Sequence, residues 1–115
     1  MLTLYGIPNC DTVRKARKWL EAHGVAFAFR DLRKEGVSEA ELKAWVTRLG
    51  RDTLLNRRGR TWRELPAAQR DAISSDADAV ALMQACPTVI KRPVLVDGSR
   101  CLCGFSETEY EKLLR

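Results

Sequence analysis

The chain has 115 residues, of which 45% are apolar and 30% charged, and its formal net charge at pH 7 is +5. This length supports a single domain around one core. No apolar run approaches the roughly 20 residues that span a bilayer, and no basic-then-apolar leader opens the chain, so a cytoplasmic protein without membrane contact is expected. Basic residues are spread among acidic ones, except around Arg57, Arg58, Arg60 and Arg63, which favours a small anion or an acidic protein surface over direct nucleic-acid binding.

The four cysteines do not form a recognisable disulfide or zinc pattern. Cys10 and Cys86 are solitary in sequence, while Cys101 and Cys103 have neither a second pair nor a nearby histidine. Zinc sites need closely spaced pairs of such ligands, and disulfide frameworks belong to secreted chains. We therefore expect free thiols, no metal site and no bound cofactor.

The first 24 residues predict a strand followed by a helix. Residues 2–5 favour a β-strand, which Gly6 and Pro8 end. From Asp11 onward, apolar residues recur at helical spacing until Gly24, a residue typical of helix C-termini. The expected inward positions of this helix are Val13, Ala16, Trp19 and Leu20.

Residues 25–32 predict a second strand, with Val25, Phe27 and Phe29 on one face. A strand, a helix and a strand joined by short links form a βαβ unit, so the two strands should be parallel with a right-handed crossover.

The middle of the chain predicts helices. Ser38 and Glu41 have the spacing of a capping box for a helix that Gly50 closes. A short helical turn and a basic loop around Trp62 occupy residues 52–65, and two more helices are expected at 67–73 and 75–86. The inward residues expected for the last of these helices are Ala79, Leu82, Met83 and Cys86.

The C-terminal part predicts a hairpin and a closing helix. Residues 92–105 contain two apolar runs around an Asp97–Gly98 turn, and Ser106 has capping-box spacing to Glu109. The order βαβ, helices, ββα predicts one α/β domain over residues 1–115. Its architecture is thioredoxin/glutaredoxin-like, with a mixed four-stranded sheet and a helical insertion at about 36–88.

Cys10 lies where the first strand passes into the first helix. The amide groups that open a helix lack internal partners and favour an anion in front of them, so the thiolate of Cys10 should be favoured. Arg14 and Lys15 add positive charge, and Asp11 opposes it. A lone cysteine that only packs in a turn is the alternative, but this position favours a reactive thiolate. Val13 stands where a Cys-x-x-Cys motif would have its second thiol.

Pro93 would open the third strand, a position that admits two readings: an ordinary strand-start proline, or a cis-proline at a tight turn. The residues alone leave both open. If this strand borders the first one, Lys91 and Arg92 bring positive charge to the end of the sheet where Cys10 lies.

Three stretches of the chain together resemble the ArsC/Spx/YffB family of thioredoxin-like proteins, and most closely its YffB branch. They are YGIPNCDTVRKARKWL near the N-terminus, LLNRRGRTWREL in the middle, and PTVIKRPVLVDG followed by GFSETEYEKLL. The resemblance covers essentially the whole chain. It implies a thioredoxin-like domain with a helical insertion and a cis peptide bond before Pro93.

The resemblance identifies Cys10 with the nucleophile of the family. Glutaredoxin-dependent arsenate reductases hold their oxyanion with three arginines, of which only Arg92 is retained here. The second position falls at Asn56, next to Arg57, and the third falls at Gly104. Each charge-assisted contact contributes about 1.5–3 kcal/mol, so efficient arsenate reduction is not expected.

The resulting hypothesis is a monothiol reductase in which Cys10 attacks a glutathionylated thiol and external glutathione, as co-substrate, resolves the adduct. Arg92 would position the anion, with Asn9 or Arg14. Glutaredoxin is a candidate partner, and a monomer is expected. An Spx-like regulator that binds the RNA polymerase α subunit is the alternative, and arsenate reduction ranks third.

Overall fold

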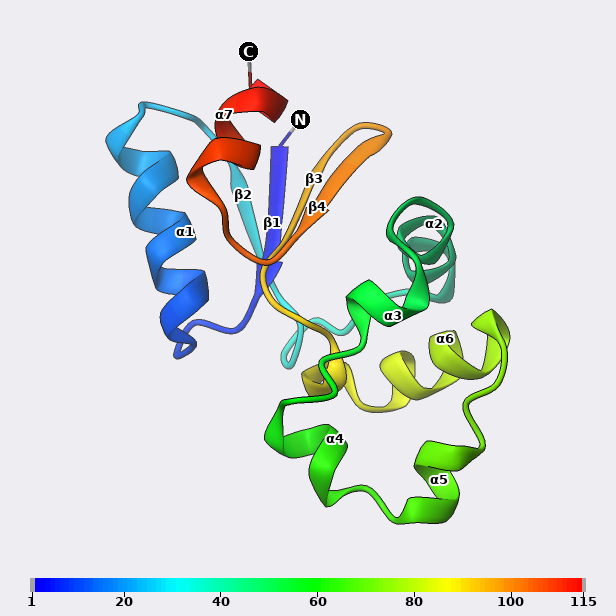
Figure 1. Ribbon diagram of the computed structural model, residues 1–115. Coiled ribbons are helices and arrows are strands. Elements are labelled where there is room, and N and C mark those ends of the chain that lie inside the picture. Colours follow the sequence, from blue (N-terminus) through cyan, green and yellow to red (C-terminus); the bar gives the residue numbers. More distant parts are fainter. Residues whose placement is uncertain (1, 115) are drawn as a thin grey trace. The chain divides into compact units, whose positions relative to one another are not determined.

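The computed structural model describes residues 2–114, which divide into two compact units. The first, here called the sheet unit, comprises residues 2–35 and 92–114 and contains all the strands of the described chain. The second, the helical unit, comprises residues 36–91 and is inserted between the two segments of the first (Figure 1). Each unit is described by itself below.

The sheet unit contains a mixed four-stranded sheet in the order β2-β1-β3-β4, which confirms the predicted α/β architecture. Its first strand, β1 (Leu2–Gly6), is central and runs parallel to β2 (Ala28–Asp31). On its other side it pairs antiparallel with β3 (Val94–Asp97), which pairs antiparallel with the edge strand β4 (Arg100–Cys103).

Two helices pack on one face of this sheet, α1 (Asp11–Ala22) and α7 (Glu107–Leu114). The core that they share with β1 and β3 consists of Leu2, Leu4, Ala16, Leu20, Leu95, Tyr110 and Leu113. Several of these side chains are completely buried, and burying a leucine or a valine stabilises the fold by about 1.5–3 kcal/mol. This core fixes the direction in which α1 leaves the sheet.

The second strand is shorter than predicted, because it begins at Ala28 rather than Val25. The amide of Val25 is used elsewhere: it donates to the Leu20 carbonyl at 3.0 Å and closes the C-terminus of α1 after Gly24, whose φ is +66°. Val25 and Phe27 nevertheless pack against the core, as expected.

The hairpin turn lies one residue later than predicted. Asp97 pairs with Arg100 in the sheet register, so the two turn residues are Gly98 and Ser99. Gly98 has a φ of +59°, which suits the first position of such a turn. An ion pair of 2.8 Å between Asp97 and Arg100 lies across the turn.

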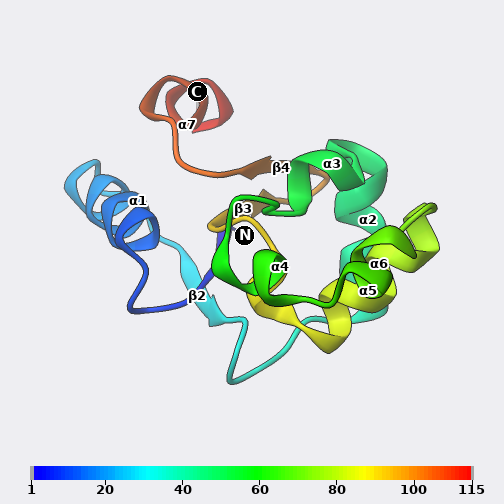
Figure 2. The same ribbon diagram turned by 60° about the horizontal axis from the view of Figure 1, so that its bottom comes forward.

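The helical unit contains the remaining helices: α2 (Glu39–Leu49), α3 (Arg51–Leu54), α4 (Arg60–Glu64), α5 (Ala67–Asp71), α6 (Asp76–Ala85) and the 3-10 turn η1 (Pro87–Val89). The predicted capping box of α2 is present, with Ser38 and Glu41 each accepting from the other's amide. Helices α2 and α6 pack side by side (Figures 1 and 2).

The inward face of α6 differs in part from the prediction. Ala79 and Met83 are buried as expected, but Val80 takes the place predicted for Leu82, which is half-buried. Cys86 is half-buried too and lies just beyond the helix, where its amide donates to the Leu82 carbonyl. Packing against α2 determines which face of α6 is buried. Because the sequence of α6 has no strong apolar stripe, its periodicity does not indicate this face.

The closing helix α7 begins as predicted, since the Ser106 hydroxyl oxygen accepts a 3.3 Å hydrogen bond from the Glu109 amide. None of the helices among residues 2–114 is long and apolar enough to cross a membrane.

Candidate functional site

The loop between β1 and α1 places Cys10 at the N-cap of the helix. Its amide donates to the Ile7 carbonyl at 3.1 Å, which closes a tight turn through the exposed residues Pro8 and Asn9. Its own carbonyl accepts the amide of Arg14 at 2.9 Å, the first hydrogen bond of the helix. The chain therefore turns from strand to helix at Cys10, as the sequence predicted.

The Cys10 side chain is half-buried and makes no capping hydrogen bond to the helix. Serine, threonine and aspartate are common at this position because their oxygens accept the first helical amides. A neutral thiol does so weakly, whereas an anion there is stabilised by these amides and by the helix dipole. The position is thus suited to a group that becomes negatively charged.

The two charged residues of the first turn largely offset each other. Arg14 and Asp11 form an ion pair of 2.8 Å, and both side chains are more than half exposed. The guanidinium of Arg14 is therefore directed to Asp11.

Val13 occupies the position of a second thiol and is completely buried. It packs against the end of β1 so closely that a Cβ on Gly6 would lie 2.7 Å from a Val13 methyl carbon. This contact explains the glycine at position 6, and it confirms that Val13 belongs to the apolar stripe of α1.

Arg92 and Pro93 lie at the same edge of the sheet as Cys10. Because β3 is antiparallel to β1 and pairs Val94 with Tyr5, the residues that precede β3 lie beside the residues that follow β1. The Arg92–Pro93 peptide bond is cis, which confirms the expectation from the resemblance. Pro93 is buried, its carbonyl accepts the Gly104 amide at 2.8 Å, and Arg92 is half-buried.

Gly104 follows β4 at this edge with a φ of +81°. Side chains other than glycine rarely adopt this conformation, which costs about 1–2 kcal/mol. By the resemblance, this is the position of the third oxyanion-binding arginine of the arsenate reductases. In this chain its backbone conformation favours glycine.

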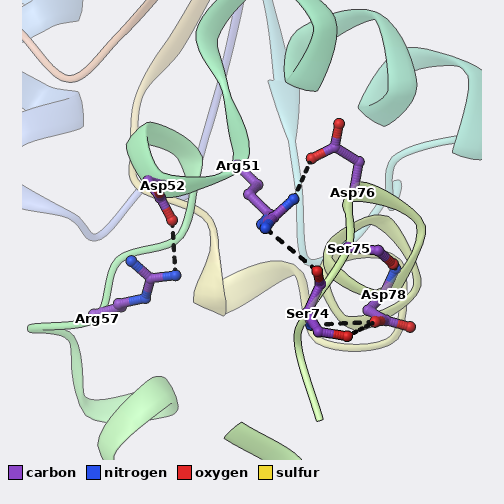
Figure 3. A network of polar contacts seen from close by, with 7 residues as sticks. All are labelled: Arg51, Asp52, Arg57, Ser74, Ser75, Asp76 and Asp78. Carbon is purple, nitrogen blue, oxygen red and sulfur yellow. Dashed lines mark hydrogen bonds and ion pairs between the residues drawn. The ribbon is translucent and has the colours of Figure 1, made fainter. Parts of the chain in front are cut away.

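The other two predicted residues, Asn56 and Arg57, belong to the helical unit. The main-chain amide of Asn56 donates to the Val89 carbonyl at 2.9 Å, and the Asn56 side chain packs against Gly59. Arg57 forms a 2.9 Å ion pair with Asp52 (Figure 3). Its guanidinium lies 5.5 Å from the centre of the Trp62 ring. Both partners of Arg57 thus belong to its own unit.

A polar network next to this pair ties the start of α6 to α3. Arg51 forms an ion pair of 2.8 Å with Asp76 and donates to the Ser74 carbonyl (Figure 3). The Asp78 carboxylate accepts a hydrogen bond from the Ser74 amide. The Asp78 amide in turn donates to the Ser75 hydroxyl oxygen, which caps the helix. Hydrogen bonds from Ser74 and Ser75 lower the pKa of Asp78 below its usual value.

The structure therefore brings Cys10, Asn9, Arg92 and Pro93 to one sheet edge, and Arg14 to the first turn of the adjoining helix. No group of three or more histidine, cysteine or acidic side chains among residues 2–114 is arranged to hold a metal ion. The prediction from sequence did not include an aromatic groove beside α1. The residues that form this groove are more than 80 positions apart, so no local sequence pattern indicates it.

Comparisons with known proteins by sequence and by structure point to one family. Residues 5–113 match the profile of the ArsC family. The chain is 39% identical over 111 residues to an uncharacterized protein of Haemophilus influenzae, with 96% of both chains covered. It is 34% identical over 116 residues to the global transcriptional regulator Spx of Enterococcus faecalis, covering 99% of this chain and 86% of the regulator.

Solved structures agree with this assignment. A YffB protein is 44% identical, with a TM-score of 0.95 over 100% of both chains. An arsenate reductase-related protein of Brucella melitensis is 41% identical, with a TM-score of 0.76 over 99% of this chain and 94% of its own.

Proposed function

Since this chain belongs to the ArsC family, we propose that it is a thiol reductase that uses Cys10 as its only nucleophile and glutathione as the resolving thiol. The observation that carries the proposal is the placement of Cys10. Its side chain stands uncapped at the start of a 12-residue helix, and the position of a second thiol is filled by the buried Val13.

The reaction has two exchange steps. The Cys10 thiolate attacks the glutathione sulfur of a mixed disulfide, forms a Cys10–glutathione disulfide and releases the substrate thiolate, which takes up a proton. A glutathione thiolate then attacks the adduct, which yields glutathione disulfide and returns the Cys10 thiolate. The sum is one mixed disulfide and one glutathione converted to one free thiol and one glutathione disulfide.

Cys10, Arg92 and Asn9 at the sheet edge have separate roles in these steps. The first amides of α1 stabilise the thiolate of Cys10 both as nucleophile and as leaving group. Arg92 supplies positive charge for a glutathione carboxylate, which a guanidinium can bind in bidentate fashion. The exposed Asn9 lies next to Cys10 and offers an amide to the peptide groups of the bound thiol.

Arsenate is a weaker candidate substrate. Asn56 and Gly104 replace two of the three arginines that the resemblance assigns to oxyanion binding. At about 1.5–3 kcal/mol for each lost contact, the affinity for arsenate falls by roughly 10²–10⁴.

Turnover of a small mixed disulfide tests the proposal. The mixed disulfide of glutathione and 2-mercaptoethanol should be reduced by the wild-type protein with glutathione, and Cys10→Ser should abolish this activity. Cys86→Ser is the matched control, because that half-buried thiol lies in the helical unit, and it should leave the rate unchanged. Equal activity of wild type and Cys10→Ser would refute the proposal.

A second candidate is a regulatory role like that of the Spx relatives, which align with 99% of this chain. In that case the chain would bind the RNA polymerase α subunit, as the resemblance implies. Binding of the purified α subunit that is equal for the wild type and Cys10→Ser, together with no thiol turnover, would favour this role.

A further inference from the structure

A groove runs along α1 in the sheet unit, on the flank of the helix that faces the start of α7. It is lined by Lys15, Lys18, Trp19, Phe105 and Glu107 and has a volume of about 420 Å³. All five residues belong to the sheet unit. This volume is in the range of sites that hold small ligands or single side chains.

The floor of the groove is aromatic and rigid. The half-buried rings of Trp19 and Phe105 both meet the buried Tyr110 edge to face, at centroid distances of 5.7 and 5.0 Å. His23 stacks on Trp19 at 3.9 Å, and its ring nitrogen Nδ1 lies 2.8 Å from the Trp19 carbonyl. Aromatic rings that are already fixed bind an apolar side chain at little entropic cost.

The rim of the groove is predominantly positive. Lys15 and Lys18 are exposed, and within residues 2–114 neither ammonium group makes an ion pair or a hydrogen bond. Glu107 is the one carboxylate that lines the groove. An apolar floor beside two uncompensated cations fits a polypeptide segment that carries an apolar side chain flanked by carboxylates.

The groove lies beside the same helix whose N-terminus carries the nucleophile. Lys15 and Trp19 are five and nine residues beyond Cys10, which corresponds to about 8 and 14 Å along the helix axis. An extended peptide advances about 3.3 Å per residue. A substrate whose disulfide is at Cys10 would therefore place the side chain three to five residues away over the aromatic floor.

From these observations we infer that the groove is a docking site for an acidic segment of a protein substrate, with its apolar anchor three to five residues from the disulfide. This role in substrate selection rests on the proposed thiol reductase activity, whereas docking itself requires no chemistry at Cys10. The protein would then act on glutathionylated proteins with acidic flanking sequences in preference to small disulfides.

A labelled peptide tests docking separately from catalysis. The probe is a nine-residue peptide with a leucine between two glutamates, four residues from a glutathionylated cysteine, and its binding to the Cys10→Ser protein is followed by fluorescence anisotropy. The double variant Lys15→Glu/Lys18→Glu should lower the affinity about tenfold, and added salt should weaken the wild-type complex. Glu107→Gln should strengthen binding slightly.

The control variant Lys34→Glu/Lys112→Glu makes the same change in net charge at two exposed lysines that do not line the groove, and it should bind as the parent does. Equal binding of a probe with lysines in place of the glutamates, tighter binding of a single-stranded oligonucleotide, or equal losses in both double variants would overturn the inference.

Turnover then separates the two proposals. For turnover, the groove variant with an active Cys10 is Lys18→Glu, which leaves Lys15 near Cys10 unchanged. It should lose several-fold in kcat/KM for the peptide and keep the rate for the 2-mercaptoethanol disulfide. If no disulfide is turned over but the anisotropy result holds, the reductase proposal fails and the docking site stands. If the small disulfide is reduced and the groove variant reduces the peptide as well as the wild type does, the docking site fails alone.

Discussion

The substitution Val13→Cys tests the single-thiol mechanism in depth, because it supplies the resolving thiol that the chain lacks. Position 13 lies one turn after Cys10, and the Cα atoms of the N-cap and third residues of a helix are about 5 Å apart, within the 4.4–6.8 Å that a disulfide requires. A disulfide between the two positions is therefore geometrically allowed.

The expected magnitudes follow from burial and loop length. Val13 is completely buried against Gly6, so losing part of its side chain should cost about 0.5–1.5 kcal/mol in the reduced protein. Closing a four-residue loop should stabilise the oxidised protein by about 2 kcal/mol on the chain-entropy account. Urea unfolding should thus show a reduced variant less stable than the wild type and an oxidised one more stable than its reduced form.

Mass spectrometry provides the decisive assay for this variant. After exposure to glutathione disulfide, Val13→Cys should show an internal disulfide and little glutathione adduct, whereas the wild type should retain the adduct on Cys10. If Val13→Cys keeps the glutathione adduct on Cys10 and a free thiol at position 13, the thiol one turn away cannot resolve the adduct. That result would refute the reasoning.

Three further predictions concern stability. Gly6→Ala should cost about 1–3 kcal/mol, because its Cβ would lie 2.7 Å from a Val13 methyl, and Val13→Ala in the same chain should recover part of this loss; purely additive urea midpoints would contradict the contact. Gly104→Arg should lower the Tm by several degrees, since φ is +81° there, and should not create tight arsenate binding in calorimetry; an unchanged Tm would show that the turn tolerates a side chain. The pKa of Asp78 is lowered in the folded state, so its contribution to the free energy of unfolding is present above its ordinary pKa of 3.8 and is lost as pH falls below that value. Asp78→Asn should therefore be less stable than the wild type at pH 7, and the difference in urea midpoint should shrink toward pH 3. A difference that stays constant with pH would contradict the hydrogen-bonded carboxylate.

Much of the architecture could be predicted because sequence patterns over a few residues determine it. The capping pair Ser38 and Glu41, the helical stripe through Val13 and Leu20, and the alternation that ends at Phe29 each act over a few residues, and the structure confirms them. The resemblance supplied the cis bond before Pro93, which the residues alone left open.

The features that could not be predicted depend on partners distant in sequence. The face of α6 that is buried is chosen by α2, and the late start of β2 follows from the hydrogen bond by which the Val25 amide closes α1. The ion pair between Arg51 and Asp76 and the groove between α1 and Phe105 likewise need three-dimensional proximity. Sequence periodicity records which residues are apolar but not which neighbour covers them.

Mapping of glutathione adducts on the native wild-type protein at pH 7 by peptide mass spectrometry tests whether Cys10 is the single nucleophile. We expect rapid modification of Cys10 alone, reversed by added glutathione, with Cys86, Cys101 and Cys103 unmodified on the same timescale. Modification of those three thiols as fast as Cys10, or a Cys10 that stays unmodified, would contradict the assignment of Cys10 as the single nucleophile.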